Sequence, residues 1–342
     1  MGSRIIKRVA YSAVIVVLIS ILAFSMMHLA PGGPVGVLTG NPKVTGEDLS
    51  RIRASYGLDR PLPVQYLCWF RQVILRFDFG TSYVTGRDVS AMIVERVPAT
   101  LELMLAAFML ALAGACIAGV LAAVYRDSLV DQLVSIFSVG GMSVPVFWTG
   151  VMAIYLFSVR LGVLPAGGRF TYGAESSLRD HLVHLALPAV VLSFSYFGSW
   201  ARYIRGGLIE AFEGDFIVTA RAKGLGTGKV VFKHALRNAV LPAVTVMVMQ
   251  IPTMFTGAVI TETVFSWPGM GRLFFEGLQR HDHTRVLGVI VVSAILIVFF
   301  NLAGDILGMM IDPRMERRGG DEGREGAGRT KKGAMRRGEG AV

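Results

Sequence analysis

The chain has 342 residues, of which 53% are hydrophobic and 17% charged, and it carries a formal net charge of +10. Its mean hydropathy of +0.56 is higher than that of soluble domains, which excludes an ordinary soluble enzyme. In a soluble protein, the basic surplus would suggest a nucleic-acid partner. In a chain this apolar it instead fits the excess of Lys and Arg in cytoplasmic loops, and we expect no nucleic-acid partner.

Six stretches of the chain are long and apolar enough to cross a bilayer, which takes about 20 residues of helix. Backbone polar groups in lipid must be hydrogen-bonded within the spanning segment, so each stretch is predicted to be a helix. The fold class is therefore an all-α membrane protein with six transmembrane helices. The predicted spans are Val9–Ala30, Leu101–Val124, Leu133–Val159, Leu182–Trp200, Ala239–Phe265 and Val286–Ile311.

The first predicted helix follows Arg4, Lys7 and Arg8, an arrangement that it shares with secretory signal peptides. Its apolar stretch exceeds the roughly 7–15 residues of a signal core, and no small-residue cleavage site stands at its end. We expect the helix to be retained. Residues 31–97 are predicted to form a long extracytoplasmic segment with an amphipathic helix near Gln65–Arg76, so that residues 1–97 form an N-terminal unit.

Residues 98–312 are predicted to form a compact core of five helices, interrupted by a basic loop at about 202–237. Short cytoplasmic loops carry an excess of Lys and Arg, so this loop is placed in the cytoplasm. The loops at 160–181 and 266–285 are poorer in basic residues and are placed outside. With an even number of crossings, both termini are predicted to be cytoplasmic. The tail at 313–342 has too few apolar residues to bury a core and is predicted to be disordered, with its basic groups near anionic lipid.

Polar residues inside the predicted spans are candidates for a translocation path, because such groups are costly in lipid and often functional. The spacing of Gln250, Thr253 and Thr256 places them along one face of a helix. Hydrogen bonding between helices is the alternative role for each candidate. We also expect Pro145 to interrupt the third span and Pro242 to kink the fifth. The candidate path residues are Ser143, Trp148, Gln250, Thr253, Thr256 and Glu262.

The sequence contains no phosphate-binding loop, no serine nucleophile elbow and no His-Glu-x-x-His zinc motif. We therefore expect neither enzyme activity nor a cofactor in this chain. Cys68 and Cys116 lie in different predicted regions, and we assign them no disulfide and no metal. His281 and His283 are expected to be solvated rather than metal-bound. His181 and His184, one turn apart, are expected to take part in polar packing at the membrane interface.

Motifs spread over nearly the whole chain share their order and approximate spacing with one family. The chain resembles the inner-membrane permease subunit of ABC importers of the dipeptide, oligopeptide and nickel group. The resemblance implies the fold of type I importers (MetI-like), with an N-terminal helix added to a five-helix core. The motifs are His28-Leu-Ala-Pro-Gly-Gly-Pro34, Tyr56-Gly-Leu-Asp-Arg-Pro61, Asp78-Phe-Gly-Thr-Ser82, Arg96-Val-Pro-Ala-Thr100, Ser143-Val-Pro-Val-Phe147, Thr219-Ala-Arg-Ala-Lys-Gly224, His234-Ala-Leu-Arg-Asn-Ala239, Glu262-Thr-Val-Phe-Ser-Trp-Pro-Gly-Met-Gly271 and Asp312-Pro-Arg314.

The basic loop is similar to the EAA loop of this family, which implies that it contains a coupling helix seated on a cytoplasmic ATPase. Val218 stands where the broader EAA pattern has Glu, which favours the peptide and nickel group over distant importers. Small residues allow close approach, basic residues can pair with carboxylates, and glycine ends the helix. The expected docking residues are Thr219, Ala220, Arg221, Ala222, Lys223 and Gly224.

The resemblance further implies an assembly with a second, homologous permease, two ATPases and an extracytoplasmic solute-binding protein, in a bacterial or archaeal plasma membrane. Substrate selectivity would then reside largely in the binding protein, so the chain does not distinguish peptides from nickel. Two alternatives remain. A secondary transporter would work without ATPase partners, and a membrane-embedded enzyme would need a catalytic set that the sequence does not show.

Overall fold

The computed structural model describes residues 2–29, 47, 51, 59–173 and 177–311, so the predicted tail at 313–342 and most of the segment 30–58 lie outside the described residues. Within these ranges the chain is helical, with one isolated bridge, between Thr81 and Asp88, and no strand. The helices are α1 (Gly2–Leu29), α4 (Leu62–Arg76), α5 (Val89–Val124), α6 (Leu129–Ser143), α7 (Val146–Ala153), the π-helix η1 (Ile154–Arg160), α8 (Leu178–Phe212), α9 (Asp215–Ala222), α10 (Thr227–Lys229), the π-helix η2 (Val230–Ala235), α11 (Leu236–Met249), α12 (Ile251–Val264), α13 (Met270–Gln279) and α14 (His283–Ile311).

Four of these helices, α1, α5, α8 and α14, are each long and apolar enough to cross a membrane. Two further pairs pass the same test only together: α6 with α7 and η1, and α11 with α12. Counting each bent pair as one span gives six spans within the described residues. This confirms the predicted all-α architecture.

Two spans extend well beyond the predicted apolar segments. Helix α5 has 36 residues and α8 has 35, and at about 1.5 Å per residue both exceed the ~30 Å hydrocarbon layer. Both begin at a polar cap: the side chain of Asp88 accepts from the backbone N–H groups of Ser90 and Ala91, and that of Ser177 accepts from the N–H of Asp180. The turns that lie beyond the predicted segments contain charged residues, which is why the apolar pattern of the sequence did not include them.

The bent pairs show where proline interrupts a span. The third span breaks at Val144 and Pro145, as predicted, and the chain direction bends by 108° at this break. Val144 is extended, the conformation favoured before proline. In the fifth span the 47° bend lies at Gln250, and Pro252, without an N–H for the preceding turn, follows in the first turn of α12. Pro242 lies inside α11, so the kink predicted there stays a prediction, and the bend at Gln250 was not predicted from the sequence.

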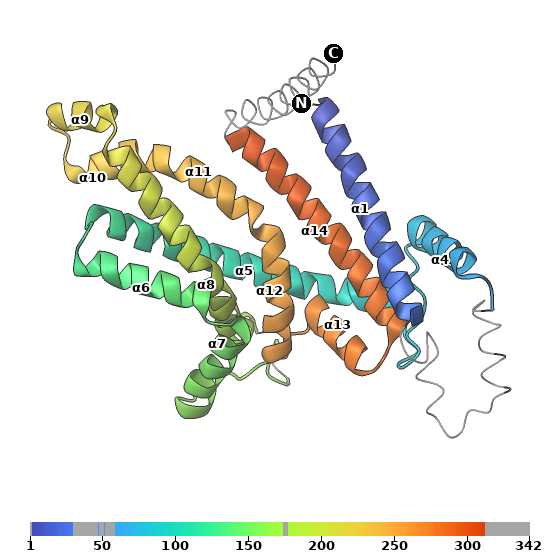
Figure 1. The fold of residues 1–342 in the computed structure, drawn as a ribbon. Coiled ribbons are helices and arrows are strands. Elements are labelled where there is room, and N and C mark those ends of the chain that lie inside the picture. The colour runs from blue at the N-terminus through green and yellow to red at the C-terminus, as the bar shows by residue number, and fades with distance from the viewer. Residues whose placement is uncertain (1, 30–46, 48–50, 52–58, 174–176, 312–342) are drawn as a thin grey trace, which may run out of the picture.

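The helices pack in two groups (Figure 1). Helices α5, α6 and α8 form one group and approach closely because glycines face backbone: a Cβ at Gly198 would lie 2.2 Å from the carbonyl oxygen of Ser138, and one at Gly119 would lie 2.8 Å from that of Ala201. Helices α1 and α14 lie side by side in the other group, joined by an ion pair between Arg8 and Asp305. The pair α11–α12 connects the two groups.

Candidate functional site

The loop between α8 and α11 is a short helical hairpin at one end of the molecule (Figure 1). Its first helix, α9, starts after Gly214 and ends at Ala222, with Lys223 as its cap. Gly224 follows with a φ of +73°, a conformation that residues with a side chain rarely adopt. The glycine stop predicted from the sequence is confirmed, although the helix begins four residues before Thr219.

The inner face of α9 packs on the chain itself. Ile217 and Ala220 are buried in one hydrophobic cluster with Val230 of η2. The carbonyl oxygen of Ala220 accepts a hydrogen bond of 3.3 Å from the N–H of Leu225, which closes the turn. Ala220 therefore serves the internal packing of the hairpin. Its predicted contact with a partner stays a prediction.

The other five predicted docking residues lie on the outer face of α9 and in the turn that follows it, and all are exposed: Thr219, Arg221, Ala222, Lys223 and Gly224. The same hairpin carries exposed apolar side chains: Phe216 and Val218 on α9 and Phe232 on η2, of which Val218 and Phe232 are 64% and 66% exposed. Large apolar side chains gathered on a loop outside the membrane spans indicate a contact surface. Sequence reasoning did not single out Phe216 or Phe232, because the exposure of an aromatic residue in a loop that also contains buried aliphatic residues does not follow from residue type.

An ion pair between a buried carboxylate and a partly exposed arginine connects the last turns of α8 to the start of α6. Asp131, buried at the first turn of α6, accepts two hydrogen bonds of 2.7 Å from Arg205 on α8. A longer contact of 3.7 Å joins Arg126, in the turn between α5 and α6, to Glu213 at the end of α8. Bidentate pairs of this kind fix geometry as well as energy. The end of α8 that leads into the hairpin is thus joined to the start of α6 and to the turn before it.

The structure brings together some of the candidate path residues. Thr253 and Thr256 are exposed on α12, and their spacing from the exposed Ile260 places all three along one face of this helix. Gln250 lies apart from this face: it is half-buried and accepts a hydrogen bond of 2.6 Å from Nε1 of Trp200 on α8.

The remaining candidates divide between the surface and the core. Ser143 and Trp148 flank the break in the third span and are exposed. Glu262 is fully buried at the end of α12, where it accepts hydrogen bonds from Thr100 Oγ1 at 2.6 Å, from Gly271 N at 2.7 Å and from Arg272 N at 3.2 Å. It joins α12, α13 and α5 through hydrogen bonds, which is the alternative role that the sequence analysis gave for each candidate. It does not lie on the exposed face that carries Thr253 and Thr256.

Polar packing also explains the two histidines at the start of α8. Glu102 on α5 pairs with Arg169 at 2.7 Å and with His181. His184 is buried and lies 3.2 Å from Oγ1 of Thr171. These contacts match the expected interfacial packing. Among the residues that the structure describes, no group of three His, Cys, Asp or Glu side chains could hold a metal ion.

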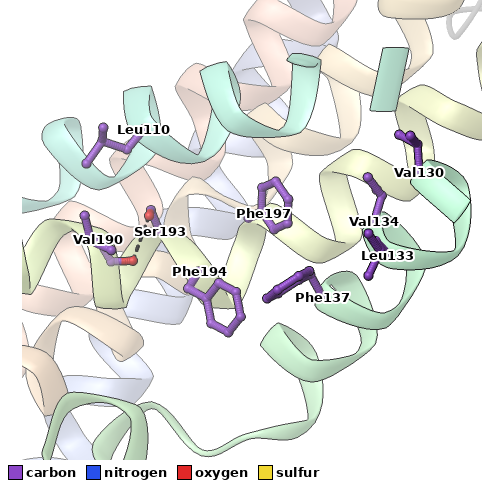
Figure 2. A pocket seen from close by; sticks show the side chains of 9 residues that line it. All are labelled: Leu110, Val130, Leu133, Val134, Phe137, Val190, Ser193, Phe194 and Phe197. Carbon is purple, nitrogen blue, oxygen red and sulfur yellow. Dashed lines mark hydrogen bonds between the residues drawn. The ribbon is translucent and has the colours of Figure 1, made fainter. Parts of the chain in front are cut away.

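An apolar cavity of about 410 Å³ lies between α5, α6 and α8 (Figure 2). Its one polar lining side chain, Ser193, donates its hydroxyl to the carbonyl oxygen of Val190 at 2.8 Å. The cavity therefore offers no free polar group to recognise a polar solute. The lining residues are Leu110, Val130, Leu133, Val134, Phe137, Val190, Ser193, Phe194 and Phe197.

Comparison with known proteins gives matches over nearly the full chain. Residues 115–317 match the model of the binding-protein-dependent transport system inner membrane component, and residues 1–104 match the model of its N-terminal part. The oligopeptide transport system permease protein AppB of Bacillus subtilis is 40% identical over 92% of this chain and 100% of its own length. The di/tripeptide permease DppB of Pseudomonas aeruginosa is 39% identical over 87% of this chain and 94% of its own.

A solved structure supports the fold. A chain of the inward-facing MetNI methionine ABC transporter superposes with a TM-score of 0.52 at 21% identity, covering 65% of this chain and 96% of its own. At this identity the likeness concerns the fold alone, and it agrees with the predicted MetI-like core.

Proposed function

Because the chain belongs to the family of inner-membrane components of binding-protein-dependent transport systems, we propose that it is the membrane permease subunit of an ATP-driven importer of peptides. The relatives are transport permeases rather than enzymes, and two of the most similar are named for oligopeptide and di/tripeptide transport. In this proposal the chain works with a second permease, two cytoplasmic ATPases and an extracytoplasmic binding protein. ATP is hydrolysed by the ATPases. Nickel is the alternative cargo.

The observation that carries the proposal is the two-sided packing of α9. One side is held by the chain's own core through Ile217 and Ala220, and the other presents apolar and basic side chains to a partner. A helix that is fixed on one side and exposed on the other transmits a push from a docked protein. The pair of Asp131 and Arg205 would pass that movement from α8 to α6.

In the proposed topology both termini and the loop at about 202–237 are cytoplasmic, and residues 98–312 form the translocating core. Residues 1–97 add a helix and an extracytoplasmic segment, and residues 313–342 form a basic tail. The exposed face of α12 with Thr253 and Thr256, together with Ser143 and Trp148 at the break in the third span, is the proposed side of the path. Alternating access follows when movement of α9 changes the angle between these helices.

The test replaces Gly224, whose φ of +73° disfavours any side chain, by valine. The matched control is Gly226→Val in the same loop, where φ is −65° and, as at Gly224, open space surrounds the backbone. We expect Gly224→Val to lower ATPase association and peptide uptake at least about tenfold, a change of about 1.4 kcal/mol. Gly226→Val should keep both. Unchanged association, coupling and uptake in Gly224→Val would refute the docking role, and uptake without any ATPase would establish a secondary transporter.

A further inference from the structure

Helix α4 presents two different apolar faces. The first faces α1: Phe24 lies 5.6 Å from the ring of Tyr66 and 5.7 Å from that of Trp69, and Val73 is buried beside them. Tyr66 also shares a hydrogen bond of 2.9 Å with Ser20. The second face points away from the protein, and Leu67, Ile74 and Leu75 on it are 63%, 64% and 68% exposed.

The exposed residues form one continuous stripe. Their positions along α4 repeat at the intervals of three and four that define one side of a helix. A stripe that leaves large aliphatic side chains uncovered needs an apolar surrounding. The stripe consists of Val64, Leu67, Cys68, Arg71, Ile74 and Leu75.

The level at which α4 crosses α1 indicates what surrounds it. The crossing is at Phe24, five residues before Leu29, the last described residue of the apolar span of α1. At 1.5 Å per residue this is about 8 Å from the end of the span. Interfacial helices bury their apolar face about 5–10 Å into the boundary between headgroups and acyl chains. In Figure 1, α4 lies on the outer side of α1, away from α5 and α8.

The charges of α4 suit the same position. The helix contains Arg71 and Arg76 and no acidic residue, and Arg60 precedes it. A long arginine side chain can cover apolar surface with its stem while its guanidinium reaches the headgroups. We propose that α4 is an interfacial anchor. The apolar residues of the stripe (Val64, Leu67, Cys68, Ile74 and Leu75) contact lipid, and the guanidinium groups of Arg71 and Arg76 contact anionic headgroups.

Cys68 allows a direct test because it is a free thiol within the stripe. In the Cys116→Ala chain, reconstituted with its ATPase and permease partners, Cys68 carries a polarity-sensitive fluorophore. We expect strong quenching by lipids with a nitroxide near the headgroup, weaker quenching by lipids with a nitroxide near the chain end, and little quenching by aqueous iodide. Two references in a Cys68→Ser, Cys116→Ala background set the limits: Leu18→Cys on the exposed side of α1, and Tyr172→Cys, whose side chain is 100% exposed.

A charge variant separates lipid contact from protein contact. Ile74→Glu should increase iodide quenching at Cys68 at least about twofold, whereas Gln72→Glu, exposed on another side of α4, should leave it unchanged. Iodide quenching at Cys68 equal to that at Tyr172→Cys would overturn the proposal. Shielding from iodide that appears only when the binding protein is added would also overturn it and assign the stripe to that protein. Neither outcome would touch the ATPase-docking proposal, which concerns α9.

Discussion

Two regions of this chain that carry sequence motifs differ in where they place the motif side chains: one exposes most of them and the other buries them. In the hairpin of α9, most of the motif residues keep their side chains in solvent, and only Ala220 faces inward. In the joint between α12 and α13, Glu262 and Trp267 are fully buried and bonded to α5 through Thr100 and the carbonyl oxygen of Ala99. Both regions carry recognisable sequence patterns, so the pattern alone does not tell a contact surface from an internal joint.

The two regions differ in whether their polar side chains are hydrogen-bonded within the chain. The carboxylate of Glu262 accepts three hydrogen bonds from donors within the chain, so it needs no donor from a partner or from solvent. The charges of Arg221 and Lys223 lie in water, free to meet a partner. A substitution should therefore damage the protein's stability at the joint and its binding at the hairpin.

The largest expected effect is at the joint. Glu262→Ala removes the acceptor for the Thr100 hydroxyl and for the N–H groups of Gly271 and Arg272. Each buried donor without a partner costs about 1–3 kcal/mol, so we expect the free energy of unfolding to fall by about 3 kcal/mol or more. The midpoint of thermal unfolding of the purified chain in detergent measures this loss.

Glu262→Gln is the matched control, because its amide oxygen can still accept from the N–H groups and its NH₂ can donate to the hydroxyl oxygen of Thr100. Its midpoint should fall much less. Equal midpoints for the alanine and glutamine variants would show that the bonds of Glu262 do not hold the joint. Peptide uptake lost in Glu262→Gln at full stability would move this residue to the path.

The two regions also show what can be predicted from the sequence. Six spans, the break at Pro145 and the glycine stop of α9 follow from local rules of length and backbone conformation. The role of Glu262 depends on Thr100, a partner 162 positions away, which no local spacing shows. The inward position of Ala220 depends on the packing of α9 against η2, which no local spacing shows.

An intermediate effect is expected on the outer face of the hairpin. Phe232→Asp places a charge among the exposed apolar groups without touching the core. Large apolar side chains at the centre of an interface carry much of its binding energy, so we expect ATPase affinity to fall about tenfold, or about 1.4 kcal/mol. The unfolding midpoint should not change. Titration of the ATPase onto the reconstituted chain measures the affinity.

Two variants sharpen this result. Tyr172→Asp, a fully exposed aromatic residue on another loop, should leave ATPase affinity unchanged. Ala220→Phe, on the inner face of the same hairpin, should lower the unfolding midpoint because the buried site has no room for a ring. If Phe232→Asp lowered the unfolding midpoint as much as Ala220→Phe, the contrast between an exposed outer face and a buried inner face of the hairpin would be wrong.

The smallest expected effect concerns the charges of the hairpin. Exposed ion pairs contribute about 0.2–1 kcal/mol each and are screened by salt, so Arg221→Gln and Lys223→Gln should each weaken ATPase docking about two- to fivefold at low ionic strength and hardly at all near 1 M salt. Arg87→Gln, which removes an exposed charge paired with Glu95 at 2.6 Å far from the hairpin, is the control and should leave the salt dependence intact. A salt dependence that persists in the double variant of Arg221 and Lys223 would place the charged contact elsewhere on the loop. Phe232→Ala, which removes apolar contact without adding a charge, should keep the wild-type salt dependence because apolar contact is not screened, and this separates the two components of the proposed docking surface.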